Sequence, residues 1–127
     1  MTENKSTILI IDDEIVSRYT IEALLESDHY TLVFAENGIQ GLEKAQAMSP
    51  DLILLDVMMP GMNGFAVCRK LRAEERLAAV PVIMITAWDD ETARQRCLEA
   101  GADDVIRKPF KRPDLHAKVE RLILRAS

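Results

Sequence analysis

Five short apolar runs recur along the chain, and they contain few polar residues. They are TILII (7–11), TLVFA (31–35), DLILL (51–55), VPVIMI (80–85) and the weaker DVI (104–106). Most are dense in Ile, Val and Leu and do not alternate with polar residues, which is typical of strands buried on both faces of a parallel sheet. The pattern therefore predicts five strands of one parallel sheet.

Amphipathic stretches with helical periodicity separate these runs. They span residues 14–27, 37–48, 64–76, 89–100 and 113–125. Pro113 suits the first turn of the last stretch, and Gly101 is expected to end the helix before it. Five βα units joined by right-handed crossovers place helices on both faces of the sheet, so the predicted fold class is α/β.

Length and composition fit one domain. The chain has 127 residues, of which 48% are hydrophobic and 29% are charged, enough for one core and a solvated surface. We expect the domain core over 7–125, with residues 1–6 loose or disordered. The net charge of −5 argues against direct nucleic-acid binding and against an anionic membrane surface.

Nothing in the sequence predicts a membrane span or export. No apolar run approaches the roughly 18 residues that a membrane helix needs, and MTENKST lacks the apolar core of a signal peptide. Cys68 and Cys97 form no CxxC pair and are expected to be buried or semi-buried thiols, while His29 and His116 are isolated. A reducing cytoplasm fits these features.

Polar residues follow four of the five strands. Because ligands bind outside the carboxyl ends of the strands in an open α/β sheet, these residues are candidates for one shared site. They are Asp12, Asp13 and Glu14 after the first strand, Asp56 after the third, Thr86 after the fourth, and Arg107, Lys108 and Pro109 after the fifth.

Asp56 interrupts the apolar run LILLDVMM (52–59). A lone ionised carboxylate is costly to bury unless it is paired, hydrogen-bonded or bound to a metal. We therefore expect Asp56 at the strand end and outside the core, where Pro60, Gly61 and Gly64 turn the chain into the next helix.

The candidate residues suggest phosphoryl chemistry. Asp12, Asp13 and Asp56 would repel one another if all were ionised and close, and a divalent cation removes that conflict. A few oxygen ligands favour Mg²⁺, which pairs naturally with phosphate. Lys108 adds positive charge, Thr86 adds a hydroxyl donor, and a carboxylate can act as the nucleophile to form an aspartyl-phosphate.

Four motifs carry a resemblance to a known family. IIDDE (10–14), LLDVMMPGMNG (54–64), VIMITA (82–87) and GADDVIRKPF (101–110) stand in an order and spacing similar to the receiver domain of two-component response regulators. The resemblance covers nearly the whole chain. It implies a flavodoxin-like fold with strand order 2-1-3-4-5, and a phosphorylation switch rather than a turnover enzyme.

The resemblance also implies roles for the candidate residues. Asp56 would accept a phosphoryl group from the phosphohistidine of a sensor histidine kinase or a histidine phosphotransfer protein. Asp13 would bind Mg²⁺ directly, Asp12 mostly through water, and the backbone carbonyl of Met58 would complete the protein ligands with Asp56.

Phosphorylation would then be sensed by two further residues. Thr86 and Lys108 would contact the phosphoryl oxygens, and the Lys108–Pro109 bond is expected to be cis. Thr86 would move inward and shift a face formed by the last helices and strands, which would act on an output domain or target protein.

The sequence departs from the family pattern at four positions. Val105 replaces the aromatic residue that often swings inward on phosphorylation, so the switch would consist of Thr86 and a residue without a ring. Asn63 stands where Asp is more usual, with little expected effect. Met58 and Trp88 occupy the two variable positions that tune dephosphorylation, and their apolar bulk is expected to lengthen the life of the phosphorylated state.

Simpler explanations exist for several residues. Asp12 and Asp13 could cap the next helix, and Asp56 could be a turn residue before Pro60, although neither explains the whole set. The last segment is locally basic, which favours a solvated helix face over a partner or homodimer surface. Its charged residues are Arg107, Lys108, Lys111, Arg112, Lys118, Arg121 and Arg125 against Asp114 and Glu120.

Two other functions fit less well. An enzyme of the haloacid dehalogenase type needs a second acid two residues after its nucleophile, where this chain has Met58. A flavodoxin-like electron carrier needs a loop that accepts a flavin phosphate, where this chain has Asp12, Asp13 and Glu14. The sequence fits both a stand-alone regulator and the N-terminal domain of a longer protein.

Overall fold

A computed structural model describes residues 5–87 and 91–126, with the side chains up to residue 124. In that part of the chain strands and helices alternate strictly. The strands are β1 (Ser6–Ile11), β2 (Tyr30–Ala35), β3 (Leu52–Asp56), β4 (Val82–Thr86) and β5 (Asp104–Arg107). The helices are α1 (Ile15–Leu25), α2 (Gly38–Met48), α3 (Gly64–Ala73), α4 (Glu91–Glu99) and α5 (Arg112–Ala126).

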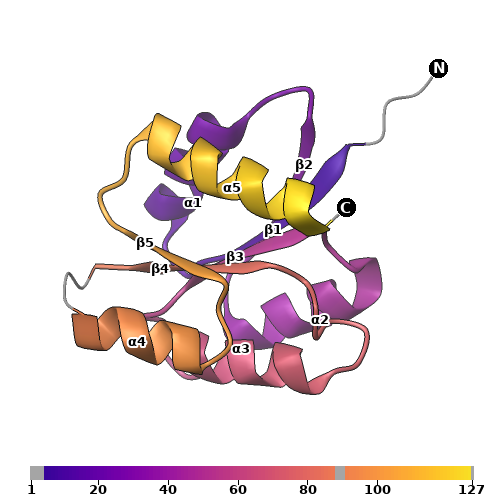
Figure 1. Ribbon diagram of the computed structural model, residues 1–127, viewed down its shortest axis with the longest axis vertical. Helices are drawn as coiled ribbons and strands as arrows, with labels where there is room; N and C mark the ends of the chain where they lie inside the picture. Colours follow the sequence, from indigo (N-terminus) through magenta and orange to yellow (C-terminus); the bar gives the residue numbers. More distant parts are fainter. Residues whose placement is uncertain (1–4, 88–90, 127) are drawn as a thin grey trace.

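The strands form one parallel sheet in the order β2-β1-β3-β4-β5, which confirms the predicted α/β fold and its strand order. Figure 1 shows α1 and α5 on one face of the sheet and α2, α3 and α4 on the other. The sheet is therefore doubly wound. Its central strands β3 and β4 are buried along their whole length, whereas β2 at one edge is only partly buried.

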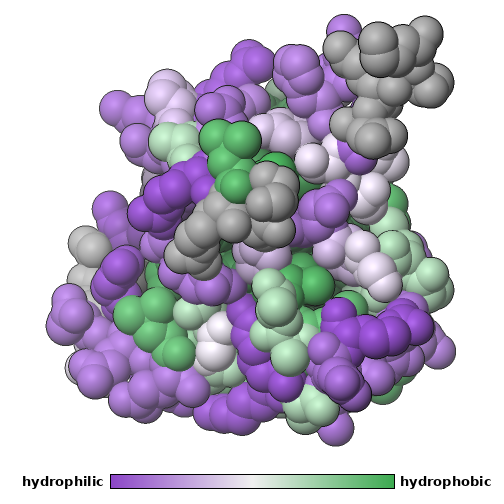
Figure 2. All heavy atoms as spheres, turned by 45° about the vertical axis from the view of Figure 1, so that its right-hand side comes forward, coloured by the Kyte–Doolittle hydropathy of each residue, from purple (hydrophilic) through white to green (hydrophobic). Residues whose placement is uncertain are grey.

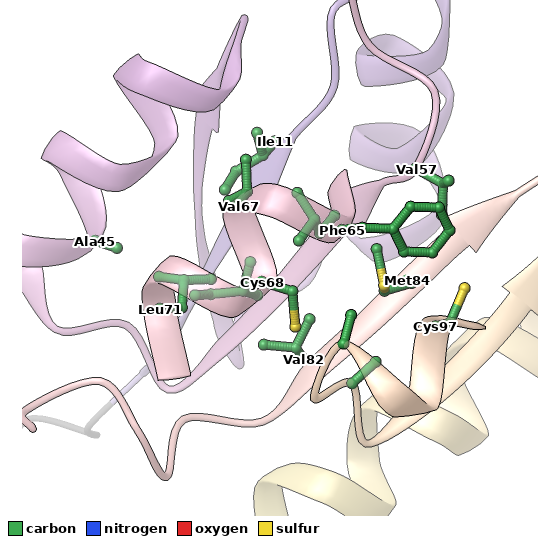
Figure 3. Packing of buried hydrophobic residues seen from close by; sticks show 14 of the residues in the cluster. Ile11, Ala45, Val57, Phe65, Val67, Cys68, Leu71, Val82, Met84 and Cys97 are labelled. Carbon is green, nitrogen blue, oxygen red and sulfur yellow. The ribbon is translucent and has the colours of Figure 1, made fainter. Parts of the chain in front are cut away.

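Each face of the sheet has its own hydrophobic core, because successive side chains of a strand point to opposite faces. In β3, Leu52 and Leu54 pack toward α1 and α5, while Ile53 and Leu55 pack toward α2, α3 and α4. Figure 3 shows the second core, where side chains of α3 such as Leu71 point toward the sheet. The run of apolar residues in β3 thus serves two cores at once.

The element boundaries differ from the predicted ones in a few places. Ser6, which was expected in a loose N-terminus, belongs to β1 and pairs with Tyr30 of β2. Its N–H donates to the His29 carbonyl at 3.1 Å. Val80 and Pro81 precede β4, whereas Thr86 belongs to it. The helix predicted over 64–76 ends at Ala73, and residues 89–90 of another predicted helix lie outside the described residues.

Figure 2 shows one face on which polar side chains predominate and hydrophobic ones form small groups between them. Over the described residues, every helix is too short or too polar to cross a membrane.

Candidate functional site

The sheet order brings the polar strand ends together. β1, β3, β4 and β5 are consecutive neighbours, so Asp12, Asp56, Thr86 and Lys108 lie along one edge. Backbone hydrogen bonds extend the sheet pairing past the strands: the Lys108 N–H donates to the Thr86 carbonyl at 2.8 Å, and the Val57 N–H donates to the Ile85 carbonyl at 3.0 Å. The site is therefore held by the sheet itself.

Four carboxylates meet at this edge. Asp12, Asp13, Glu14 and Asp56 each offer one oxygen, and these oxygens lie within 4.8 Å of one another. Glu14 was not predicted as a ligand, although it stands in the same acidic run. Its exposed side chain reaches the cluster because the chain turns sharply between β1 and α1.

Asp12 is completely buried, and both of its carboxylate oxygens accept hydrogen bonds. Oδ1 accepts from the Glu14 N–H at 3.0 Å; Oδ2 accepts from the Ser17 hydroxyl and lies 3.5 Å from Lys108 Nζ. The N-cap of α1 is Glu14, so neither Asp12 nor Asp13 caps that helix. The capping explanation for the acidic pair is thereby ruled out.

Asp13 is bonded very differently. Its Oδ1 is buried and accepts no hydrogen bond from the part of the chain that the structure describes. A buried carboxylate oxygen without a donor is costly unless a cation or water satisfies it. Asp13 therefore has an oxygen left over for a ligand.

Asp56 is the last residue of β3, as expected, and belongs to neither hydrophobic core, but its side chain is buried and only 4% exposed. Its Oδ1 accepts a long hydrogen bond of 3.4 Å from the Met58 N–H. Burial, and then the negative charge of Asp12, raise the pKa of Asp56 to about 7, against the opposing effect of Lys108. Asp56 is thus a carboxylate poised between its two protonation states near neutral pH.

The start of α3 packs closely against the backbone of Asp56 and Val57. A Cβ on Gly64 would lie 2.4 Å from the Asp56 carbonyl oxygen and 2.8 Å from the Val57 Cα, so only glycine fits this close approach. The Asn63 side chain accepts from the Ala66 N–H at 3.0 Å and caps the helix. Asn63 thus makes a bond that an Asp carboxylate would also make at this position.

Lys108 and Thr86 complete the edge. The Lys108 side chain is 26% exposed and reaches inward to Asp12, and the peptide bond between Lys108 and Pro109 is cis as predicted. Thr86 is 2% exposed. Met58 is 56% exposed beside Asp56, whereas Trp88 lies outside the described residues.

Val105, which is expected to take part in the switch with Thr86, lies in β5. Val105 is buried at the core side of this strand. The preceding residue, Asp104, binds α5 through Lys118 Nζ at 3.1 Å and through Arg121, and Arg94 of α4 lies 3.9 Å away. Two of the basic residues assigned to a solvated face therefore pair with a buried acid, a partner that the sequence analysis missed.

The backbone and thiol expectations hold. Gly101 has a φ of +111° and follows α4, where its N–H donates to the Leu98 carbonyl at 3.0 Å, as expected of a helix end. Cys68 and Cys97 are buried free thiols of one core, with pKa values raised chiefly by burial.

Comparison with protein families gives a clear result. The model of the response regulator receiver domain matches residues 8–120. The chain belongs to the receiver domain family of two-component response regulators. The predicted resemblance is confirmed, and with it the assignment as a signalling receiver domain.

Individual relatives agree. The receiver domain is 42% identical over 124 residues to the transcriptional regulatory protein ResD of Bacillus subtilis, covering 98% of this chain and 50% of ResD. The chain thus spans about half the length of this curated relative.

Solved structures show the same fold. A putative response regulator from Chloroflexus aurantiacus is 30% identical with a TM-score of 0.91, covering 95% of this chain and 99% of that one. The receiver domain of sensor histidine kinase PA1611 from Pseudomonas aeruginosa is 36% identical with a TM-score of 0.87, covering 94% and 98%. The latter is described with a magnesium ion coordinated in its active-site cleft.

Proposed function

We propose that Asp56 accepts a phosphoryl group from a phosphohistidine on a sensor histidine kinase or a histidine phosphotransfer protein. The observation that carries this proposal is the state of the Asp56 carboxylate. It is 4% exposed, poorly hydrogen-bonded, and close to both an acidic cluster and Lys108. A carboxylate with few donors keeps its oxygen free to act as a nucleophile.

The acidic cluster fits Mg²⁺. We assign Asp13, Asp56 and the backbone carbonyl of Met58 as direct ligands, with Asp12 acting mostly through water. The buried Oδ1 of Asp13, which accepts no hydrogen bond from the described residues, supports a cation there. Oxygen ligands and a neighbouring phosphate are what Mg²⁺ prefers. When bound, the ion would supply positive charge that offsets the carboxylates and the incoming phosphoryl oxygens.

The residues of the chain would each do one task. An ionised Asp56 oxygen forms a bond to phosphorus while the P–N bond of the phosphohistidine breaks, and the imidazole nitrogen keeps the electron pair and takes up a proton. Lys108 and Thr86 donate hydrogen bonds to the phosphoryl oxygens, as their place on the same edge supports. Asp56 returns to a free carboxylate when water later hydrolyses the aspartyl-phosphate.

The chain would then act as a switch rather than as a turnover enzyme. Thr86 moves toward the phosphoryl group, and Val105 of β5 fills the vacated space without a ring flip. The shifted face would engage an output domain or a target protein, or a second copy through the last helices. These partners, a cytoplasmic location, and one domain over residues 1–127 with its core at 7–125 are part of the proposal.

Intact-mass measurement tests the phosphorylation site. Wild type incubated with acetyl phosphate and Mg²⁺ should gain one phosphoryl adduct, which EDTA prevents and Asp56→Asn abolishes. Asp28→Asn removes an exposed carboxylate from a loop far along the chain and should react as wild type does. If wild type stays unmodified by both acetyl phosphate and a phosphohistidine donor, phosphoryl transfer is excluded and a phosphorylation-independent binding domain remains.

We also propose that Met58 and Trp88 prolong the phosphorylated state. Met58 is exposed beside Asp56, where its side chain hinders an attacking water. Replacing Met58 by Asn and Trp88 by Glu should speed loss of the phosphoryl group, followed by the decay of the adduct mass after the donor is removed. Unchanged or slower decay would contradict this role.

A further inference from the structure

Oδ2 of Asp12 lies near two donors, and one of them, Lys108, also binds the phosphoryl group in the proposed function. Asp12 Oδ2 accepts from the Ser17 hydroxyl and lies 3.5 Å from Lys108 Nζ. The other oxygen, Oδ1, accepts from the Glu14 N–H at 3.0 Å. Asp12 is 0% exposed, so its oxygens depend on these protein donors.

Lys108 cannot satisfy Asp12 and a phosphoryl group equally. In the proposed function its ammonium turns toward the phosphoryl oxygens, which lengthens or breaks the contact with Asp12. A buried carboxylate oxygen that loses its last donor is strongly destabilised. The Ser17 hydroxyl can continue to donate to Asp12 Oδ2 when Lys108 moves, because Ser17 lies on α1 and Lys108 lies on the β5–α5 loop.

We propose that Ser17 is a positioning residue: its hydroxyl keeps the buried Asp12 carboxylate bonded while Lys108 leaves it for the phosphoryl group. The inference rests on the proposed function, since it gives a reason why Lys108 is free to move. Without the hydroxyl, Lys108 is held by Asp12, and phosphorylation slows.

The local structure separates this role from simple support of the fold. Ser17 lies in the first turn of α1, two residues after Ile15, and its side chain is half-buried. The Asp12 backbone is held independently, because Arg18 Nη1 donates to the Asp12 carbonyl at 2.7 Å while Nη2 lies 3.7 Å from Glu36. Loss of the Ser17 hydroxyl therefore affects the Asp12 carboxylate and leaves its backbone anchored.

The first experiment measures the rate of phosphorylation by acetyl phosphate at saturating Mg²⁺. Ser17→Ala should slow it about tenfold, the factor expected when one hydrogen bond to a charged group is lost. Ser17→Thr retains a hydroxyl and should restore the rate to within about twofold of wild type. Thr20→Ala is the matched control, because the Thr20 hydroxyl donates to the Val16 carbonyl of its own helix.

The second experiment shows whether Ser17 acts through Lys108. In a Lys108→Met background, Ser17→Ala should slow the remaining rate by much less than tenfold, because there is no ammonium to release. Calorimetry gives a second measure that needs no phosphorylation. Ser17→Ala should raise the Mg²⁺ dissociation constant about threefold when Lys108 is present, since a tightly held ammonium opposes the cation, and should not raise it in the Lys108→Met background.

The outcomes separate the two proposals. If wild type reacts with neither donor, the proposed function fails. If wild type reacts and Ser17→Ala reacts equally fast, the role of Ser17 is wrong while the function stands. The role of Ser17 would also be wrong if Ser17→Ala had equal effects in both Lys108 backgrounds, or if Ser17→Ala bound Mg²⁺ more tightly than wild type. If Lys108→Met reacts too slowly for a comparison of rates, the Mg²⁺ dissociation constants decide.

Discussion

Two buried aspartates of this receiver domain are equally shielded from water, but their pKa values are shifted in opposite directions. Asp56 and Asp104 are each 4% exposed. Asp56 accepts a 3.4 Å hydrogen bond from the Met58 N–H, and burial raises its pKa to about 7. For Asp104 burial also acts to raise the pKa, but the Val105 N–H, Lys118 and Arg121 outweigh it and lower the value.

The contrast shows that donors, more than burial, set the charge of a carboxylate in this fold. Asp104 begins β5 and accepts hydrogen bonds from the neighbouring Val105 N–H at 2.7 Å and from Lys118 Nζ of α5 at 3.1 Å, so it is a structural acid. Asp56 ends β3 and faces other acids, so its pKa is raised. The four predictions below test this difference, starting with the largest effect.

Neutralising Asp104 should destabilise the fold most. Asp104→Asn leaves Lys118 and Arg121 close together without their buried counter-charge, and we expect a loss of about 3 kcal/mol in the free energy of unfolding. Urea denaturation of wild type and variant measures it. Asp28→Asn at an exposed position should change stability by less than about 0.5 kcal/mol; a similarly small effect at Asp104 would remove its structural role.

The same chemical change at Asp56 should have the opposite sign. Asp56→Asn removes a poorly satisfied buried charge, so we expect the metal-free protein to gain about 2 kcal/mol at pH 8. Urea denaturation in EDTA gives the value. A destabilised variant would show that Asp56 is as well accommodated as Asp104, and the comparison would fail.

That gain should depend on pH. The pKa of Asp56 is raised from 3.8 to about 7, so its contribution to stability is fully present below pH 3.8 and is lost as the pH rises to about 7. The stability difference between Asp56→Asn and wild type should therefore fall from about 2 kcal/mol at pH 8 to near zero at pH 4. A difference that stays constant between these pH values would mean that another group is responsible.

Mg²⁺ should offset part of the loss of stability that the buried Asp56 charge causes in wild type. At a concentration ten times the dissociation constant, Mg²⁺ should stabilise the domain by about 1.4 kcal/mol, because it binds the folded state. Asp13→Asn removes the carboxylate with the unpartnered buried oxygen and should reduce this effect to less than about 0.3 kcal/mol at the same concentration. Full stabilisation of the variant by Mg²⁺ would move the cation away from Asp13.

Much of the fold was readable from the sequence because its signals are local. Five apolar runs without alternation determine strands buried on two faces, and one polar residue after each of several runs marks the ligand edge of a parallel sheet. Asp12, Asp13, Asp56, Thr86 and Lys108 could be chosen on that basis, and the sheet order brings them to one edge.

What the sequence left open depends on distances between segments that share no local pattern. The burial of Asp56 and the close approach of Gly64 on α3 to the Asp56 carbonyl are both features that a strand-end position does not reveal. The partners of Asp104 come from α4 and α5, and the Ser17 bond to Asp12 depends on the turn into α1. The sequence by itself determined which residues are polar and on which edge they lie. Only the tertiary structure decided which carboxylates receive cationic donors, because Lys118 and Arg121 reach Asp104 from α5, and Lys108 reaches Asp12 from the chain after β5.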